Sequence, residues 1–179
     1  VNGESEHRSI EEIKNRCTNE YIKPDIKKYN SLTSFEFGPR WNNIKEIYTG
    51  DSELISIIEM PEGFRTELKD YPLHPSMVDN ALATIPVLNQ KLKALTAVQD
   101  KDSIYLPFAY KGVKVTKPLP EKFYSHVKLK EEFDEHTEVI KFSIDFIDLK
   151  GDVFISIDEY CLKKARKARL KLNNKNNNK

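Results

Sequence analysis

The sequence predicts an α+β fold in which an antiparallel sheet packs against one long helix. Three observations predict this fold: a hairpin pattern at residues 44–60, one helical repeat at residues 75–95, and four strand-like segments after residue 102. Strands that precede and follow a single helix, without alternating with further helices, favour an antiparallel sheet with the helix laid on it. A chain of 179 residues is one domain in length and can bury a substantial core.

Residues 44–60 show the pattern of a β-hairpin. Polar and apolar side chains alternate on both sides of the Gly50-Asp51 dipeptide, and a period of two around a glycine-containing turn is typical of paired strands. The preceding residues 1–34 are polar apart from a helical patch, in which Ser9 and Glu12 have the spacing of a capping box. We therefore expect residues 1–34 to be a lead-in or linker segment.

A helix with one apolar face is predicted between Pro75 and Leu95. Apolar residues recur there at steps of three and four, which is the helical period. Pro86 lies inside this stretch. Because proline removes one helical hydrogen bond and clashes with the preceding turn, we expect a kink or a break at that point.

The second half of the chain reads as four strands. The segments are rich in Val, Ile, Phe and Tyr and are separated by turn-like stretches; they are residues 103–116, 121–133, 137–148 and 151–163. In the third segment apolar residues alternate with polar ones, so one face of that strand should be buried and the other solvated.

The charge of the chain is uneven. Residues 163–179 carry eight of the 29 basic residues and no acidic residue, so the remaining 21 basic residues face 28 acidic ones and residues 1–162 sum to −7. A basic run can bind nucleic acid or an anionic membrane. Here the body is acidic and has no nucleic-acid motif, so we interpret residues 165–179 as a solvated, Asn-rich tail and expect neither nucleic acid nor membrane as a partner.

The two cysteines, Cys17 and Cys161, match no metal or redox spacing. They are too few for a disulfide framework, which favours a reducing compartment such as the cytoplasm. The chain shows no signal peptide and no apolar run that could span a bilayer. No motif calls for a metal or another cofactor.

Three blocks of the sequence occur in an order that resembles a known family. Residues 35–41 have an aromatic-Gly-Pro-x-aromatic pattern, residues 73–82 a Leu-His-Pro-x-x-x-Asp pattern, and residues 105–113 a Leu-Pro-Phe strand. Together they resemble the C-terminal hot-dog half of modular (type I) polyketide synthase dehydratase domains. The resemblance covers roughly residues 8–164, with residues 35–164 as the hot-dog unit.

The resemblance implies a hot-dog fold, in which the antiparallel sheet wraps around one long central helix and forms half of a double hot dog. It implies removal of water from a β-hydroxyacyl chain tethered to acyl carrier protein. Asp79 falls at the position of the proton donor. The family's catalytic histidine belongs to the N-terminal hot dog, which would precede residue 1.

The same blocks imply residues that contact substrate. These are Phe37, Gly38, Pro39, His74, Pro75, Leu106, Pro107 and Phe108. Structural alternatives stay open for each block. The Gly-Pro pair reads as a turn, the His-Pro pair as the start of a helix, and residues 106–108 either as the wall of an acyl tunnel or as an ordinary core strand. Asp79 itself could simply complement a helix dipole.

Two positions depart from the family pattern. Ala83 stands where the family usually has a Gln or His that orients the aspartate, and Phe37 stands where a tyrosine is frequent. These departures leave two alternatives open: a double-bond isomerase or ring-forming relative, and a non-catalytic scaffold or docking remnant. As an isolated half, the chain would be inactive. It would need the N-terminal hot dog, or a second copy of itself, to cover its sheet edge and its apolar face.

Overall fold

The computed structural model describes residues 6–25, 37–88, 92 and 103–166. The predicted helix beyond residue 88 (apart from Leu92), the segment 26–36 and the tail from residue 167 therefore lie outside the described residues. The helical elements are α1 (Ile10–Arg16), η1 (Pro39–Trp41), η2 (Glu62–Lys69), α3 (Pro75–Ala83) and η3 (Ile85–Val87), and the strands are β1 (Glu20–Ile22), β2 (Ile44–Thr49), β3 (Glu53–Glu59), β4 (Ser103–Val115), β5 (Lys122–Leu129), β6 (Val139–Ile147) and β7 (Val153–Arg166).

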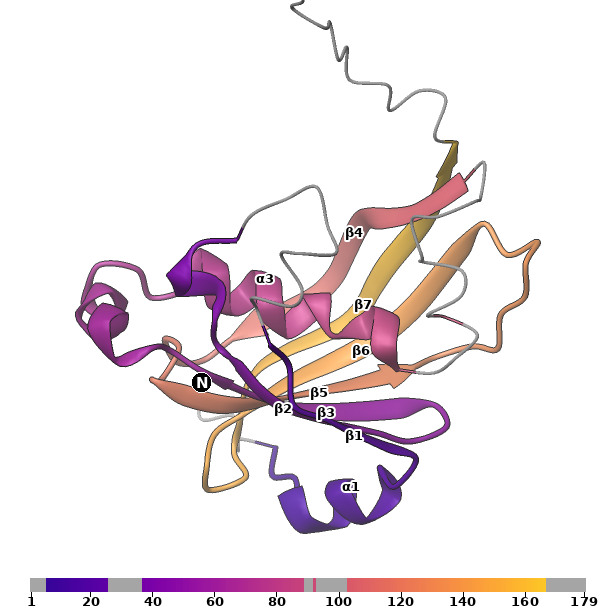
Figure 1. Ribbon diagram of the computed structural model, residues 1–179. Helices are drawn as coiled ribbons and strands as arrows, with labels where there is room; N and C mark the ends of the chain where they lie inside the picture. The colour runs from indigo at the N-terminus through magenta and orange to yellow at the C-terminus, as the bar shows by residue number, and fades with distance from the viewer. Residues whose placement is uncertain (1–5, 26–36, 89–91, 93–102, 167–179) are drawn as a thin grey trace, which may run out of the picture.

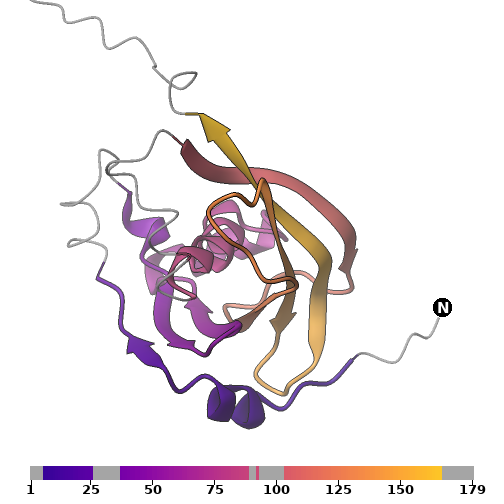
Figure 2. The same ribbon diagram turned by 90° about the vertical axis from the view of Figure 1, so that its right-hand side faces the viewer.

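The strands form one antiparallel sheet in the order β1-β2-β3-β5-β6-β7-β4. In Figures 1 and 2 the sheet curls around α3, and α1 lies on its opposite face. The expected hot-dog fold is thus confirmed, and so are the predicted hairpin and the four predicted strands.

The helix α3 packs its apolar face onto the concave side of the sheet. Met77 and Ala81 are fully buried there, against a core that includes the rings of Phe123, Phe146 and Phe154. The helix begins at the predicted residue, Pro75, and ends at Ala83, where a 3₁₀ turn containing Pro86 follows. The expected break at the proline is confirmed.

The opposite, convex face of the sheet is covered by α1. Ser9 caps this helix, since its Oγ accepts a hydrogen bond from the backbone N–H of Glu12 at 3.2 Å. Ile13 and Cys17 pack on Ile55 in a second, smaller apolar cluster. The segment expected to be a lead-in also supplies β1, which adds an edge strand to β2.

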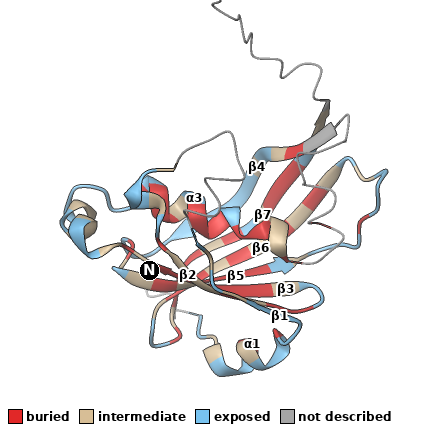
Figure 3. Cartoon of the chain, in the orientation of Figure 1, coloured by how far each residue is buried: buried red, intermediate tan, exposed pale blue. Residues whose placement is uncertain are grey.

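The two edges of the sheet differ in length. The strand β1 has three residues, whereas β4 has thirteen. The outer part of β4 is exposed (Figure 3) and carries apolar side chains, among them Phe108 and Val113, which are 62% and 53% exposed. Among the described helices, none has the length and apolarity needed to cross a membrane.

Candidate functional site

The predicted proton donor, Asp79, lies on the side of α3 that faces away from the sheet. It is the fifth residue of the helix, so its carboxyl stands beyond the first turn, where the partial positive charge of the helix N-terminus is weak. Asp79 is exposed, while its neighbours Asn80 and Ala81 are buried. The helix therefore holds its backbone rigidly and leaves the carboxyl accessible.

The side chain of Trp41 meets this carboxyl. Its indole Nε1 donates a hydrogen bond to Asp79 Oδ2 at 3.0 Å. Trp41 ends the short helix η1, so the Gly-Pro turn of the first sequence block brings the tryptophan to α3. The ring of Phe37 lies beside the indole, with 6.3 Å between the ring centroids.

A cavity of about 140 Å³ opens beside the Asp79 carboxyl. This volume corresponds to about four or five water-sized volumes, which is enough for a short segment of an acyl chain. Most of its wall is apolar. The lining residues are Pro24, Asp25, Phe37, Trp41, Asn42, Ile44, Asp79, Asn80 and Ala83.

Asn80, the neighbour of Asp79, fixes the loop that carries Trp41. Its Nδ2 donates to the Trp41 carbonyl at 2.6 Å and to Asn43 Oδ1 at 2.8 Å. Asn43 is fully buried, and its own Nδ2 donates to the carbonyl of Ser76 at 3.1 Å. These buried amides tie the start of β2 to α3, so the indole and the carboxyl are held at a fixed separation.

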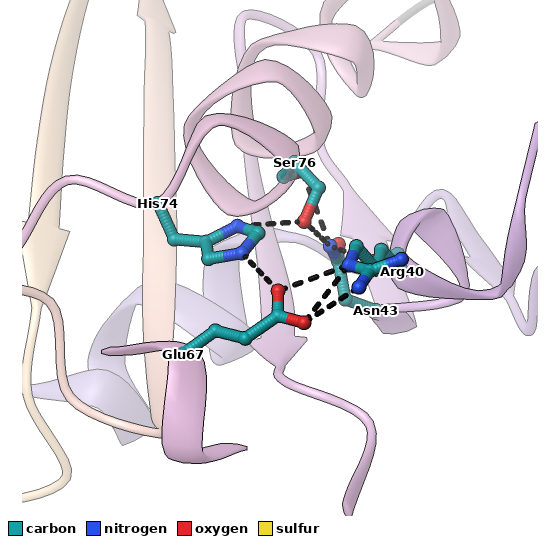
Figure 4. Close-up of polar contacts among 5 residues, drawn as sticks. All are labelled: Arg40, Asn43, Glu67, His74 and Ser76. Atoms are coloured by element: carbon teal, nitrogen blue, oxygen red, sulfur yellow. Dashed lines mark hydrogen bonds and ion pairs between the residues drawn. The ribbon is translucent and has the colours of Figure 1, made fainter. Parts of the chain in front are cut away.

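His74, at the N-cap of α3, is a buried part of this framework rather than of the cavity wall. Its Nδ1 lies 3.0 Å from Ser76 Oγ and its Nε2 lies 3.1 Å from Glu67 Oε2, as Figure 4 shows. Glu67 in turn accepts hydrogen bonds from Arg40, the shortest from Nη2 at 2.7 Å. Hydrogen bonds from Arg40 and His74 lower the pKa of Glu67 to about 2.

The third sequence block lies on β4, at the sheet edge. Leu106 is half-buried, and Pro107 and Phe108 are exposed beside an irregularity in the pairing with β7. The Nζ of Lys163 lies 4.6 Å from the centroid of the Phe108 ring. Of the residues implied by the family resemblance, the cavity is lined by Asp79 and Phe37; the other described ones, Gly38, Pro39, His74, Pro75, Leu106, Pro107 and Phe108, are not in its lining.

Two tyrosines from neighbouring strands lie on the same side as Asp79. Tyr110 of β4 and Tyr160 of β7 are paired in register, with ring centroids 5.1 Å apart. Burial raises the pKa of Tyr160, and the nearby Tyr110 and Asp79 raise it further. Both phenols are therefore protonated donors in the physiological range.

Sequence reasoning singled out neither Trp41 as a partner of Asp79 nor Asn80 as an anchor. The spacing of 38 residues between Trp41 and Asp79 crosses a hairpin and a 3₁₀ segment, and no local pattern reports such a contact. The position of Ala83 could be predicted from the sequence. It lies four residues after Asp79 and hence on the same face of the helix, and it lines the cavity. In the part of the chain that the structure describes, no group of three His, Cys, Asp or Glu side chains could hold a metal ion.

Taken together, the fold and the site define a hot-dog domain with a carboxylic acid beside an apolar cavity. The sequence model of the family described as "Polyketide synthase dehydratase N-terminal domain" matches residues 6–171. The chain therefore belongs to the polyketide synthase dehydratase family.

Curated relatives of the chain include polyketide synthases of Bacillus subtilis. Polyketide synthase PksM is 27% identical over 121 residues, which is 67% of this chain and 3% of PksM. Polyketide synthase PksN is 24% identical over 149 residues, 83% of this chain and 3% of PksN. The chain thus corresponds to a small part of each of these synthases.

Solved structures show the same fold. The dehydratase domain from the CurJ module of curacin polyketide synthase has a TM-score of 0.73 at 20% identity, covering 95% of this chain and 57% of that one. A trans-AT polyketide synthase dehydratase domain from Brevibacillus brevis has a TM-score of 0.72 at 18% identity, covering 92% and 55%. The chain therefore spans a little over half of a solved dehydratase domain.

Proposed function

We propose that the chain is the C-terminal hot-dog half of a polyketide synthase dehydratase, and that Asp79 is its proton donor. The observation that carries the proposal is the position of the Asp79 carboxyl, which is exposed at the wall of an apolar cavity. Although the family description names an N-terminal domain, the Leu-His-Pro-x-x-x-Asp block that leads into α3 favours the C-terminal half. The substrate class is a β-hydroxyacyl chain tethered to acyl carrier protein.

The proposed reaction needs one base and one acid. A histidine of the N-terminal hot dog removes the proton from the α carbon, and the electron pair left behind forms the carbon–carbon double bond. The bond between the β carbon and its hydroxyl breaks, and Asp79 gives its proton to the departing oxygen, which leaves as water. Asp79 ends as a carboxylate and the histidine ends protonated, so a proton transfer between them, directly or through solvent, restores both groups.

The CurJ and CurK dehydratases support this division of roles. Their solved structures include variants described as inactive, a histidine-to-phenylalanine variant of each protein and an aspartate-to-asparagine variant of CurK. The inactive variants thus affect a histidine in both relatives and an aspartate in CurK. This chain supplies a candidate for the second group.

The test joins the chain to an N-terminal dehydratase hot dog and offers a β-hydroxyacyl carrier protein. We expect the loss of 18 mass units that marks dehydration, and Asp79→Asn should reduce turnover at least ~100-fold. Asp70→Asn is the matched control, because Asp70 is an exposed aspartate outside the lining of the cavity and should keep activity near that of the unmodified chain. Equal turnover of Asp79→Asn and the unmodified chain would remove Asp79 from the mechanism.

A second candidate is a double-bond isomerase or ring-forming domain of the same fold. It is favoured by Ala83, whose methyl group lines the cavity one turn beyond Asp79 and cannot form a hydrogen bond. Product mass separates the two functions, because an isomerase given an enoyl chain returns a product of unchanged mass. A scaffold remnant would give neither product.

We further propose that β4 is the edge that meets the N-terminal half or a second copy of the chain. Among the described strands none pairs with the outer side of the thirteen-residue strand β4, and its exposed Phe108 and Val113 offer a surface for strand addition and apolar packing. Val113→Lys should weaken assembly in sedimentation experiments. Leu149→Lys is the matched control, since Leu149 is 60% exposed on the turn between β6 and β7. Equal assembly of both variants would exclude β4 as the contact.

The compartment proposed for the chain is the cytoplasm. Cys17 and Cys161 are both free and buried, which agrees with a chain that is not stabilised by disulfides.

A further inference from the structure

We propose that Trp41 is the positioning residue of the Asp79 carboxyl and determines which of its two oxygens carries the acid proton. This inference rests on the proposed function of Asp79 as proton donor and assigns its orientation to a residue of the first sequence block. It starts from the hydrogen bond of 3.0 Å between Trp41 Nε1 and Asp79 Oδ2. Among the described residues, this is the one hydrogen bond that the carboxyl receives.

The chemistry of the indole makes the contact directional. The indole N–H is a donor and has no acceptor. It can therefore donate to Oδ2 in the carboxylate and also in the neutral acid, but it cannot accept the acid proton from Oδ2. Because a carbonyl oxygen is a stronger acceptor than a protonated hydroxyl oxygen, the indole favours the form of the neutral acid that carries its proton on Oδ1. One oxygen is held by the protein and the other is left to deliver the proton to the substrate.

The tryptophan is held strongly enough to act in this way. Its carbonyl accepts a hydrogen bond of 2.6 Å from Asn80, the residue that follows Asp79, and its own backbone N–H donates to Gly38 at 3.0 Å. Two consecutive residues of α3 thus form hydrogen bonds with Trp41. Asn80 bonds to its backbone carbonyl, and Asp79 accepts from its indole. The backbone of Trp41 cannot move away from α3 without breaking the hydrogen bond from Asn80.

The helix itself offers no substitute. A side chain four residues after Asp79 lies on the same face and could reach the carboxyl, but that residue is Ala83. Other titratable groups near the carboxyl are Asp25 in the cavity wall and the phenols of Tyr110 and Tyr160. The indole is the nearby group that combines a fixed position with a donated hydrogen bond.

The first test uses fluorescence and needs no substrate. Trp41 is the one tryptophan of the chain, so its emission reports on this site alone. When the pH is lowered, we expect the emission to change as Asp79 takes up a proton. The change should disappear in Asp79→Asn and persist in Asp25→Asn. A transition that persists in Asp79→Asn, or no transition in the unmodified chain, would overturn the proposal.

The second test measures kinetics with the chain joined to an N-terminal hot dog. Trp41→Phe keeps an aromatic ring beside Phe37 and removes the donor, so kcat should fall roughly 10- to 100-fold with KM changed less than about 3-fold. Adding Ala83→Gln supplies an amide at the position four residues after Asp79 and should restore much of kcat. Both variants are checked for folding by circular dichroism, and the fluorescence test stands if Trp41→Phe fails to fold.

The possible outcomes separate this inference from the proposed function. If the unmodified chain dehydrates, Asp79→Asn does not, and Trp41→Phe matches the unmodified chain, Trp41 is not a positioning residue although Asp79 is the acid. A loss confined to KM, or no recovery on adding Ala83→Gln, also counts against it. If no variant dehydrates, the proposed function fails while the fluorescence titration still decides the contact.

Discussion

His126 Nε2 lies 2.6 Å from Glu53 Oε2, on the face of the sheet that α1 covers. His126 and Ile55 are paired across β5 and β3, so both side chains point to this face. Arg16, the last residue of α1, donates to the same carboxylate from Nε at 2.6 Å. The charged contact therefore connects the first helix to the centre of the sheet, far from the cavity.

Glu53 should make the stability of the chain sensitive to acid. Burial alone would raise its pKa, but hydrogen bonds from Arg16 and His126 outweigh burial and lower the pKa to about 2. Because the folded-state pKa lies below the ordinary value of 4.5, the stabilisation is complete above pH 4.5 and is lost as the pH falls from about 4.5 to about 2. We expect Glu53→Gln to lower the free energy of unfolding by about 2 kcal/mol at pH 7. Urea unfolding at pH 7 and pH 3 measures the difference.

The matched control is Glu131→Gln, because Glu131 forms an exposed ion pair with Lys141 and should change stability by less than about 0.5 kcal/mol. His126 adds a separate effect. Burial lowers its pKa against the opposing influence of Glu53, so the unfolded chain takes up a proton first and stability falls as the pH drops through about 6.5. An identical pH dependence of Glu53→Gln and the unmodified chain would contradict this account of Glu53.

Replacing His74 should affect stability and leave substrate affinity unchanged. Its ring is buried and forms hydrogen bonds with Ser76 and Glu67, so His74→Ala removes both contacts, leaves a cavity at a buried position and should cost about 1–3 kcal/mol. Thermal unfolding and KM are the two measurements. His136→Ala is the control, because the His136 side chain is 85% exposed and should be neutral. A large rise in KM for His74→Ala would instead support contact with substrate.

Gly112 should not tolerate a side chain. Its φ is +64°, and a Cβ there would collide with the side chain of Asp158. Gly112→Ala should therefore lower stability by at least about 1 kcal/mol, from the backbone conformation alone. Adding Asp158→Ala should relieve the collision but not the backbone strain. Gly63→Ala serves as the comparison, since nothing lies within 4 Å of its added Cβ; equal unfolding midpoints for the two glycine variants would refute the prediction.

The thiol of Cys17 should react slowly with alkylating reagents. Burial, with a smaller contribution from Glu53, raises its pKa to about 11. Reaction at pH 8 then requires α1 to detach, so the labelling rate reports on local opening. In a Cys161→Ser background, Glu53→Gln should accelerate labelling, because it weakens the bond to Arg16 at the end of α1. Mass spectrometry over time measures the rate; an unchanged rate would show that this contact does not hold α1.

Much of the fold follows from periodicity in the sequence. The hairpin, the four later strands and the start of α3 are encoded by local alternation, turn residues and the helical repeat, and all appear near the predicted bounds. The strand β1 was not predicted, because three residues in a polar segment carry no period and pair only through their backbone with β2. The 3₁₀ segment η2, which supplies Glu67, was not predicted either, although Phe64 and Leu68 have helical spacing and pack against the core.

The candidate site was only partly predictable. Asp79 emerged from a sequence block, and its partner Trp41 did not, because the contact depends on how a loop is anchored by the buried amides of Asn80 and Asn43. His74 lies in the same block as Asp79 but points into a network of its own. Blocks in a sequence locate a region, whereas the direction of each side chain depends on tertiary contacts.

The sheet separates the contacts on its convex face from the site on its concave face. The ion pair between Arg16 and Glu53, which holds α1, lies on the convex side, whereas the Asp79 carboxyl and the Trp41 indole lie at the outer side of α3, over the concave side. Substitutions on the convex face, for example around Arg16 and Glu53, could therefore raise the stability of the fold without disturbing the site at Asp79. Substitutions that raise thermal stability on the convex face and substitutions that change acyl-chain preference at the cavity should accordingly have additive effects in one chain.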